Sequence, residues 1–232
     1  LQDRTATHLP AAQLDVALAE LSAWPEIRAV ALGTRPDCLP ASILDVLAAH
    51  AGRLDPTVEL GLQSADDGVL ALAGRGHDVA CFAAAVRALR RRGLRVVAHV
   101  VLGLPRRRAD GRLEPEDAAG ARASARLLAE LGVDGVKLHH CHVLTGTRLA
   151  DWTAAGRFVP LEFAGYLERL LPFLEHLPRS VEVHRLVGEA PLRRVVAPEF
   201  TASKASALQR IRRAVEEADS WQGRLVPGDS PR

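Results

Sequence analysis

The sequence is poor in several residue types that commonly build a protein core. Its 232 residues include no methionine, and aromatic residues make up only 4%. Lysine occurs only at Lys137 and Lys204, so arginine supplies almost all of the basic charge. Aliphatic side chains must therefore fill most of the core. Because methionine is absent even from position 1, we expect the sequence to begin partway through a domain.

Cysteine is also scarce. Cys38, Cys81 and Cys141 are odd in number, far apart and without the spacing of a disulfide framework or a zinc site. Such usage is typical of a reducing compartment. We therefore expect a cytoplasmic protein with free thiols.

Long apolar runs and a strong charge imbalance are absent too. No stretch is long enough to cross a bilayer, and the first ten residues, LQDRTATHLP, are too polar for a secretory leader. We expect no membrane attachment. The formal net charge of +2 is too small to indicate a nucleic-acid partner. With 48% hydrophobic and 25% charged residues, the composition is ordinary for one compact domain.

Strand-like and helix-like segments alternate along the chain, which predicts an α/β fold. The expected strands cover 28–33, 57–62, 95–102, 135–143 and 181–187. The expected helices cover 11–23, 41–50, 115–131, 161–177 and 203–219. Two further helices are expected between them: the first begins at Ala65, and the second ends at Arg92.

Several residues are expected to begin, end or bend these helices. Ser64 is the expected cap of the helix that starts at Ala65, and Asp78 that of the following helix. Pro115 suits the first turn of its helix, Gly132 suits its end, and Pro172 is expected to kink 161–177.

Strand alternation sorts the polar residues by direction, because neighbours point to opposite faces of a sheet. In 57–62 the apolar residues share one face, which leaves Glu59 and then Gln63 on the other. The residues expected to join them from the later strands are His99, Lys137, His139, Cys141 and, as a further candidate, His184. Barrels usually fill their centre with branched aliphatics, so this set predicts a ligand-binding cavity at the carboxyl ends of the strands.

Five short motifs follow one another at β/α spacing. They are GTRPD at 33–37, ELGLQS at 59–64, RGHD at 75–78 followed by Cys81, HVVLGLP at 99–105 and GVKLHHCHVLTGT at 135–147. In this order, from about 28 to 200, the chain resembles the radical S-adenosylmethionine (radical SAM) superfamily, in particular its YhcC-like branch, which is related to the elongator catalytic subunit.

This resemblance implies a partial (β/α)6 TIM-like barrel over 1–190 that lacks its first β/α unit or units. A C-terminal helical extension at 191–221 and a tail at 222–232 follow, and the tail is expected to be disordered because it has little to bury. The family binds a 4Fe-4S cluster and S-adenosylmethionine, which it cleaves reductively to a 5′-deoxyadenosyl radical. A reductant such as flavodoxin or ferredoxin is the implied partner.

The resemblance also implies which residues face the cofactor and the substrate. The expected S-adenosylmethionine contacts are Arg35, Asp37, Glu59, Gln63, Ser64, His99, Gly103 and Pro105. The substrate-facing candidates are His77, Lys137, His139 and His140.

The chain departs from the family in one respect. The CxxxCxxC loop that holds the cluster is absent from the sequence and is expected upstream of Leu1. The three cysteines present cannot replace it by their spacing. We therefore expect no metal site in this chain, and no radical formation by the chain alone.

Several candidates keep two interpretations. Arg35 and Asp37 suit either direct cofactor contacts or a salt bridge that fixes their loop. The HHCH run at 139–142 contains good metal ligands, but alternate residues of a strand point apart, which favours structural or substrate-facing histidines. Lys137 is a candidate Schiff-base lysine, and His77 is as compatible with a helix-cap neighbour as with a substrate contact.

Arginines cluster at 90–92, 106–108 and 210–213. RNA is a candidate substrate because of the resemblance to the elongator type, although solvated helix ends explain such clusters equally well. Two classes of function stay open. One is a radical enzyme that is active only at full length, and the other is a cluster-free module that binds a small molecule or RNA. A lyase that uses Lys137 is a weaker third.

Overall fold

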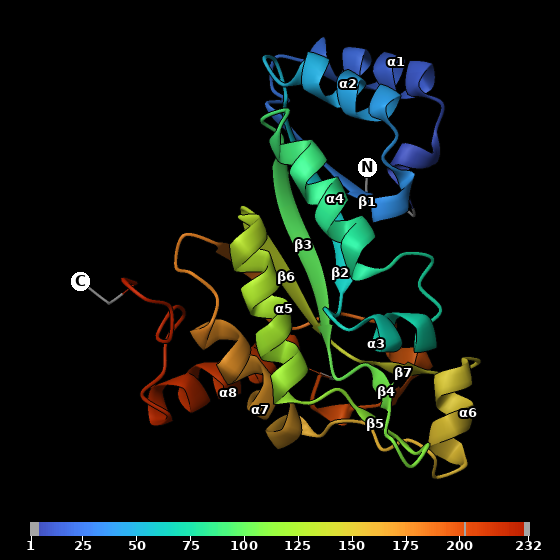
Figure 1. Cartoon of the computed structure of the whole chain (residues 1–232), viewed down its shortest axis with the longest axis vertical. Coiled ribbons are helices and arrows are strands. Elements are labelled where there is room, and N and C mark those ends of the chain that lie inside the picture. Colours follow the sequence, from blue (N-terminus) through green and yellow to red (C-terminus); the bar gives the residue numbers. More distant parts are fainter. Residues whose placement is uncertain (1–4, 202, 230–232) are drawn as a thin grey trace.

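Five parallel strands form one sheet in the order of the sequence. The structure is a computed structural model that describes residues 5–201 and 203–229 (Figure 1). The sheet has the order β1-β2-β3-β6-β8. Its strands are β1 (Ala29–Thr34), β2 (Asp55–Gln63), β3 (Arg95–Leu102), β6 (Gly135–His140) and β8 (Glu182–Arg185). All five expected strands are confirmed, although β6 ends at His140 rather than at 143.

Helices connect these strands. They are α1 (Ala11–Ser22), α2 (Ala41–His50), α3 (Asp67–Leu72), α4 (Val79–Arg90), α5 (Ala118–Leu131), α6 (Arg148–Ala154), α7 (Phe163–Glu175) and α8 (Lys204–Glu217). Short 3-10 helices cover Ala6–His8, Pro36–Cys38, Leu192–Arg194 and Glu199–Thr201. Pro172 lies inside α7, which continues to Glu175.

The helices that link successive strands lie on one face of the sheet. Right-handed crossovers between neighbouring parallel strands require this arrangement, and α4 and α5 lie in front of the strands in Figure 1. The opposite face, called the inner face below, corresponds to the interior of a barrel. The expected partial barrel of parallel strands and helices is confirmed.

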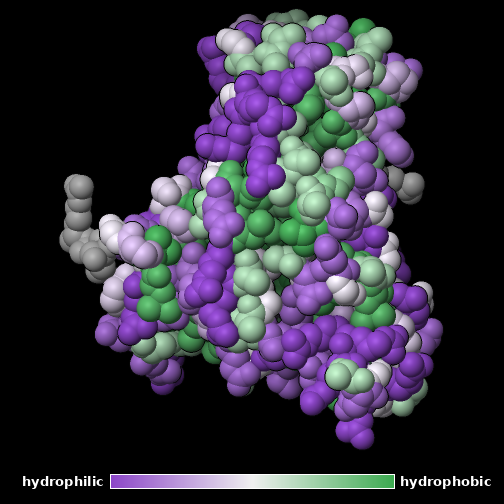
Figure 2. All heavy atoms as spheres, in the orientation of Figure 1, coloured by the Kyte–Doolittle hydropathy of each residue, from purple (hydrophilic) through white to green (hydrophobic). Residues whose placement is uncertain are grey.

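The helix-covered face of the sheet forms the core. Val58, Leu60 and Leu62 alternate along β2, and none of them has exposed surface. Phe82 of α4 is equally buried in the same cluster. Full burial of one such side chain is worth about 1.5–3 kcal/mol. Figure 2 shows hydrophilic residues over most of this side of the molecule, with hydrophobic ones gathered between α4 and α5.

Two small strand pairs were not predicted. β4 (Pro105–Arg107) and β5 (Leu113–Pro115) form an antiparallel hairpin at the carboxyl end of the sheet. β7 (Val143–Leu144) pairs with β9 (Val195–Ala197). Segments this short carry almost no periodicity, so their pairing depends on contacts between distant parts of the chain.

Two helix starts differ from expectation. α3 begins at Asp67 and is capped by Asp66, whose side chain accepts hydrogen bonds from the N–H groups of Gly68 and Val69. α5 is capped by Asp117, because Pro115 belongs to β5. The expected caps Asp78 and Gly132 are confirmed, and Gly132 has the left-handed φ of 64° that favours glycine.

The tail also needs a correction. The Gln222 amide donates to the carbonyl groups of Pro178 and Val181, both at 2.7 Å, and the Leu225 N–H donates to Glu175 at 2.8 Å. Residues 222–229 therefore lie against the end of α7, because polar contacts replace the apolar burial that they lack. The end of the expected tail, 230–232, lies outside the described residues. Among the described helices, none has the length and apolar character to cross a bilayer.

Candidate functional site

A row of residues crosses the inner face at one level. Gly61, His99, Lys137 and Arg185 are successive register partners on β2, β3, β6 and β8. Register partners in a parallel sheet project to the same face. The backbone alone therefore brings these four positions together.

Glu59 precedes Gly61 by two residues on β2, and its side chain, which is 7% exposed, reaches two members of this row. One of its carboxylate oxygens is 3.0 Å from His99 Nε2, and the other accepts a hydrogen bond from Lys137 Nζ. Burial opposes ionisation, yet the hydrogen bonds and charges of Lys137 and His99 hold the pKa of Glu59 below its usual value. Lys137 and His99 therefore stabilise the ionised form of this buried carboxylate.

His139 continues the polar set toward β8, where it contacts the Arg185 guanidinium through Nε2. Burial and the charge of Arg185 lower the pKa of His139 to about 3, so the ring is neutral. The expected convergence of Glu59, His99, Lys137 and His139 is confirmed.

His184 was a further candidate for this set, and its ring lies on the same face next to Gly135, where a Cβ would lie 2.7 Å from His184 Nε2. His184 is exposed and lies 3.3 Å from Glu182. The register shifts between Val136 and Lys137 opposite β8, which places Arg185 beside Lys137. Regular alternation did not predict Arg185 at this position.

A cavity of about 350 Å³ opens at the carboxyl ends of β1 to β3. Its lining residues are Thr5, Gly33, Thr34, Arg35, Glu59, Gly61, Gln63, Arg75 and His99. The sequence predicted Arg35, Glu59, Gln63 and His99 as neighbours. It missed Arg75, which follows α3 in a loop that shows no periodicity.

The backbone at the end of β2 is shaped for this cavity. The β2–β3 register shifts between Gly61 and Gln63, and Gln63 has a φ of 72°, in the left-handed region. A Cβ on Gly61 would lie 2.5 Å from Gln63 Nε2 and 3.1 Å from Arg75 Nη2. Glycine is therefore needed for these two side chains to lie across the strand end.

Arg35 and Asp37 form an ion pair with each other, which is one of the two interpretations that the sequence allowed. Two hydrogen bonds of 2.9 and 2.6 Å join the guanidinium to both carboxylate oxygens. The hydrogen bond to Arg35 lowers the pKa of Asp37, against the opposing effect of burial. The pair holds the loop before α2, and it leaves the Arg35 charge compensated.

The other candidates lie outside the lining of this cavity. Pro105 begins β4, and Gly103 precedes it with a φ of 83°. His77 is 8% exposed and accepts a hydrogen bond of 3.4 Å from Arg75 Nε. His140 points away from His139, with its ring centroid 5.9 Å from that of Tyr166. Ser64 is buried and donates to Glu116.

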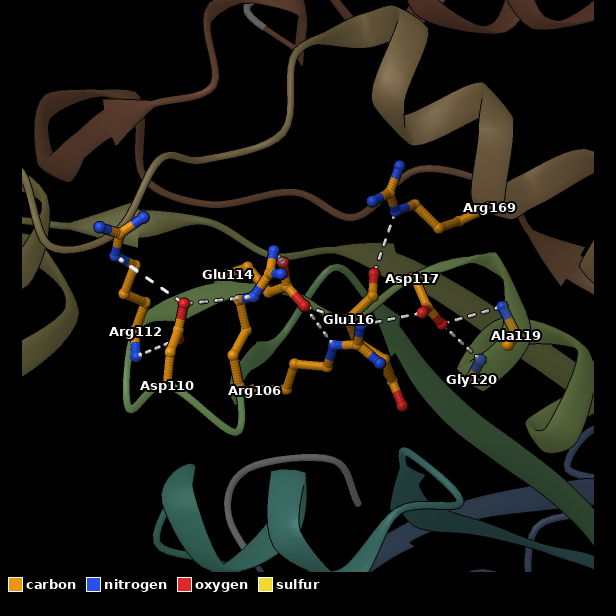
Figure 3. A network of polar contacts seen from close by, with 10 residues as sticks. Arg106, Asp110, Arg112, Glu114, Glu116, Asp117, Ala119, Gly120 and Arg169 are labelled. Carbon is orange, nitrogen blue, oxygen red and sulfur yellow. Dashed lines mark hydrogen bonds and ion pairs between the residues drawn. The ribbon is translucent and has the colours of Figure 1, made fainter.

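Glu116 connects the strand end to the hairpin. It is 4% exposed and accepts a 2.6 Å hydrogen bond from the Ser64 hydroxyl. Burial raises the pKa of Glu116 to about 7. Its carbonyl group accepts a hydrogen bond from Arg169, beside the ion pairs that join Arg106 to Glu114 and Asp117 (Figure 3). No sequence pattern distinguished Glu116 from the acidic residues around it.

A larger hollow of about 700 Å³ lies between the hairpin and residues 156–159. Its charged side chains Asp110 and Glu114 are ion-paired to neighbouring arginines, and it is remote from the polar row. We therefore take the smaller cavity as the candidate site, because several unlike polar groups converge there.

The histidine run and the cysteines do not converge on a common metal site in the described residues. His140 Nε2 lies 2.7 Å from His142 Nε2, too close for one ion to bridge both rings, while His139 is on the other face. The three cysteines are free thiols on separate elements. In residues 5–201 and 203–229, no group of three or more histidine, cysteine or acidic side chains is placed to hold a metal ion.

Comparison with known proteins places the chain among relatives of similar architecture. The Radical_SAM C-terminal domain model matches residues 133–217. The uncharacterized protein YtqA of Bacillus subtilis is 32% identical over 221 residues, which cover 95% of this chain and 66% of YtqA. Protein YhcC of Escherichia coli is 33% identical over 187 residues, which cover 80% of this chain and 58% of YhcC. The chain therefore spans less than two thirds of either relative.

Among solved structures, the N-terminally deleted Elp3 of Methanocaldococcus infernus superimposes with a TM-score of 0.77 at 21% identity. The match covers 95% of this chain and 54% of the Elp3 chain. At this identity the likeness supports the fold alone.

Proposed function

Because the chain belongs to the radical SAM superfamily, in the YhcC-like branch related to Elp3, we propose that the cavity at the ends of β1 to β3 binds S-adenosylmethionine. We further propose that the full-length protein is a radical SAM enzyme. When bound beside a reduced 4Fe-4S cluster, the cofactor supplies a 5′-deoxyadenosyl radical that abstracts a hydrogen atom from substrate.

The observation that carries the proposal is the environment of Arg75. Burial and the nearby Arg35 lower the pKa of Arg75. No carboxylate of the described chain lies within ion-pair distance of it, whereas Arg35 is neutralised by Asp37. A half-buried guanidinium that forms no direct ion pair with a described carboxylate suits the carboxylate of an amino-acid cofactor. We therefore assign carboxylate binding to Arg75 rather than to Arg35.

The other lining residues complete the fit. The Gln63 side chain offers a neutral amide donor and acceptor. Gly61 keeps the strand end open. A cavity of about 350 Å³ is at the lower end of the usual range for ligand pockets, about 300–1,000 Å³.

Residues that would hold the cluster are absent from the sequence, so the proposed cluster site belongs to a part of the protein outside this chain. An electron donor such as flavodoxin or ferredoxin would reduce it. The same cavity would serve a cluster-free binding module, which is the second candidate. The upstream coding sequence discriminates between them, because only the enzyme requires a CxxxCxxC loop. Lys137 fits a Schiff-base role less well, because its ammonium group is engaged by Glu59.

Equilibrium dialysis with labelled S-adenosylmethionine tests the binding step on the 232-residue chain. We expect saturable binding that weakens at least about tenfold in Arg75→Gln, since a hydrogen bond to a charged group contributes about 1.5–3 kcal/mol. Gly61→Ala should weaken binding similarly by filling the cavity. Arg213→Gln, which removes an exposed α8 arginine paired with Glu217, is the matched control. Absence of binding, or equal affinity in a folded Arg75→Gln variant, would overturn the assignment.

The catalytic step needs the longer protein. After reconstitution with iron and sulfide under reducing conditions, we expect it to release 5′-deoxyadenosine while the 232-residue chain does not. Cleavage by the short chain would contradict the proposal that the cluster ligands lie elsewhere.

A further inference from the structure

Arg185 occupies the end of the polar row opposite the cofactor cavity. It is the register partner of Lys137, on the edge strand β8. Between the two sides lie His99 and the Glu59–Lys137 ion pair. A molecule held at Arg185 would therefore face the cofactor cavity across the inner face.

The guanidinium of Arg185 is incompletely satisfied. One terminal nitrogen contacts His139, and the Nε atom is buried without a hydrogen-bond partner. Within the described part of the chain, no carboxylate reaches it at ion-pair distance. Glu189 is near enough to sense its charge, but that carboxylate is already bound to Lys204. Buried donors without an acceptor are rare and costly, so this one needs an explanation.

The neighbours of Arg185 add no compensating negative charge. Lys137 neutralises Glu59, and His139 is a neutral acceptor. The loop after β8 holds the His139 ring in place, since a Cβ on Gly188 would lie 2.3 Å from its Nδ1. The β6–β8 side of the row therefore carries one uncompensated positive charge with a planar set of donors.

We propose that Arg185 binds an oxyanion of the substrate, a carboxylate or a phosphate group, on the β6–β8 side of the inner face. The planar guanidinium donates two parallel hydrogen bonds to either group. Only the identification of the bound molecule as substrate rests on the proposed radical SAM function. The anion site itself stands without it.

The test measures the melting temperature of the 232-residue chain in sodium phosphate, acetate and chloride at equal ionic strength and pH 7.5. Binding to the native state raises the melting temperature with ligand concentration. We expect a saturable rise in phosphate or acetate beyond that in chloride. A response to phosphate alone identifies a phosphate ester as the substrate group, and an equal response to acetate identifies a carboxylate.

Variants assign that response to Arg185. Arg185→Gln should raise the anion concentration needed for half of the rise in melting temperature at least about tenfold. Arg213→Gln should leave that concentration unchanged. Arg185→Lys keeps the positive charge but lacks the two parallel donors of the guanidinium, so we expect an anion response between those of wild type and Arg185→Gln. This variant tests the site even if Arg185→Gln folds poorly. No rise beyond chloride, or an equal rise in the Arg185 variants, would overturn the site.

The same variants separate this proposal from the cofactor assignment. Arg75→Gln should lose S-adenosylmethionine affinity and keep the anion response, whereas Arg185→Gln should do the reverse. Loss of both properties in Arg75→Gln would place the anion in the cofactor cavity and contradict a separate site at Arg185.

Discussion

The two sides of the inner face differ in how much open space they contain. On the β1–β3 side, Gly61 leaves a cavity open, and Arg35 is paired with Asp37. On the β6–β8 side, imidazole rings occupy the inner face: the ring centroids of His99 and His139 lie 5.9 Å apart. The first side provides room, and the second provides a fixed positive charge at Arg185.

This difference shows how one sheet can position two ligands. Space for a large molecule requires small residues at the strand ends, whereas recognition of a small charged group requires a donor held by packing. The Glu59–Lys137 pair lies between the two sides and separates them electrostatically. Three substitutions are expected to break or sharpen this comparison.

The largest effect is expected at the boundary. Lys137→Met removes the ion-pair partner of the buried Glu59 carboxylate, and loss of one member of a buried pair costs about 3–5 kcal/mol. Urea unfolding at pH 7.5 measures the change. Lys204→Met is the control, because its pair with Glu189 is exposed to solvent and contributes little to stability. The double variant Glu59→Gln, Lys137→Met should recover part of the loss. Equal stability of the two lysine variants would contradict the role of Glu59.

A smaller effect on the free energy of unfolding is expected at Glu116, which is hydrogen-bonded to Ser64 next to the end of β2. Its pKa is raised to about 7 in the fold, so the native state binds the proton more tightly than the unfolded chain. Stability from this group is present below a pH of about 4.5 and is lost as the pH rises through 7. Glu116→Gln keeps an acceptor for Ser64 and removes the titration.

Urea unfolding of this variant between pH 5 and 8 checks the sign. We expect little difference from wild type at pH 5 and a gain of up to about 3 kcal/mol at pH 8, since each pKa unit corresponds to about 1.4 kcal/mol. Glu20→Gln, an exposed change on α1, should show no such trend. A parallel pH profile in Glu116→Gln and wild type would exclude Glu116 as the source.

The smallest effect is expected at the exposed pair of the cavity side. The side chains of Arg35 and Asp37 are 41% and 32% exposed, so Arg35→Ala should cost at most about 1 kcal/mol of stability. Affinity for labelled S-adenosylmethionine should stay within about twofold of wild type, in contrast to Arg75→Gln. A tenfold loss in a folded Arg35→Ala variant would assign the cofactor contact to Arg35 instead.

Local patterns determined much of this protein. The period of two in 57–62 and 95–102 was enough to predict that Glu59 and His99 face the same interior, because side-chain direction in a strand depends only on the backbone. Helix ends at Asp78 and Gly132 followed from capping chemistry for the same reason. The parallel sheet followed from the alternation of strands and helices.

Only the tertiary structure decided the remaining features, because each depends on residues distant in sequence. A register shift between β6 and β8 placed Arg185 beside Lys137. The loop after α3 brought Arg75 to the strand end, and the packing of β5 against β4 buried Glu116 beside Ser64. The sequence determines the chemical groups that the side chains carry. Strand register, the path of loops and burial determine which of these groups lie close enough together to form a site.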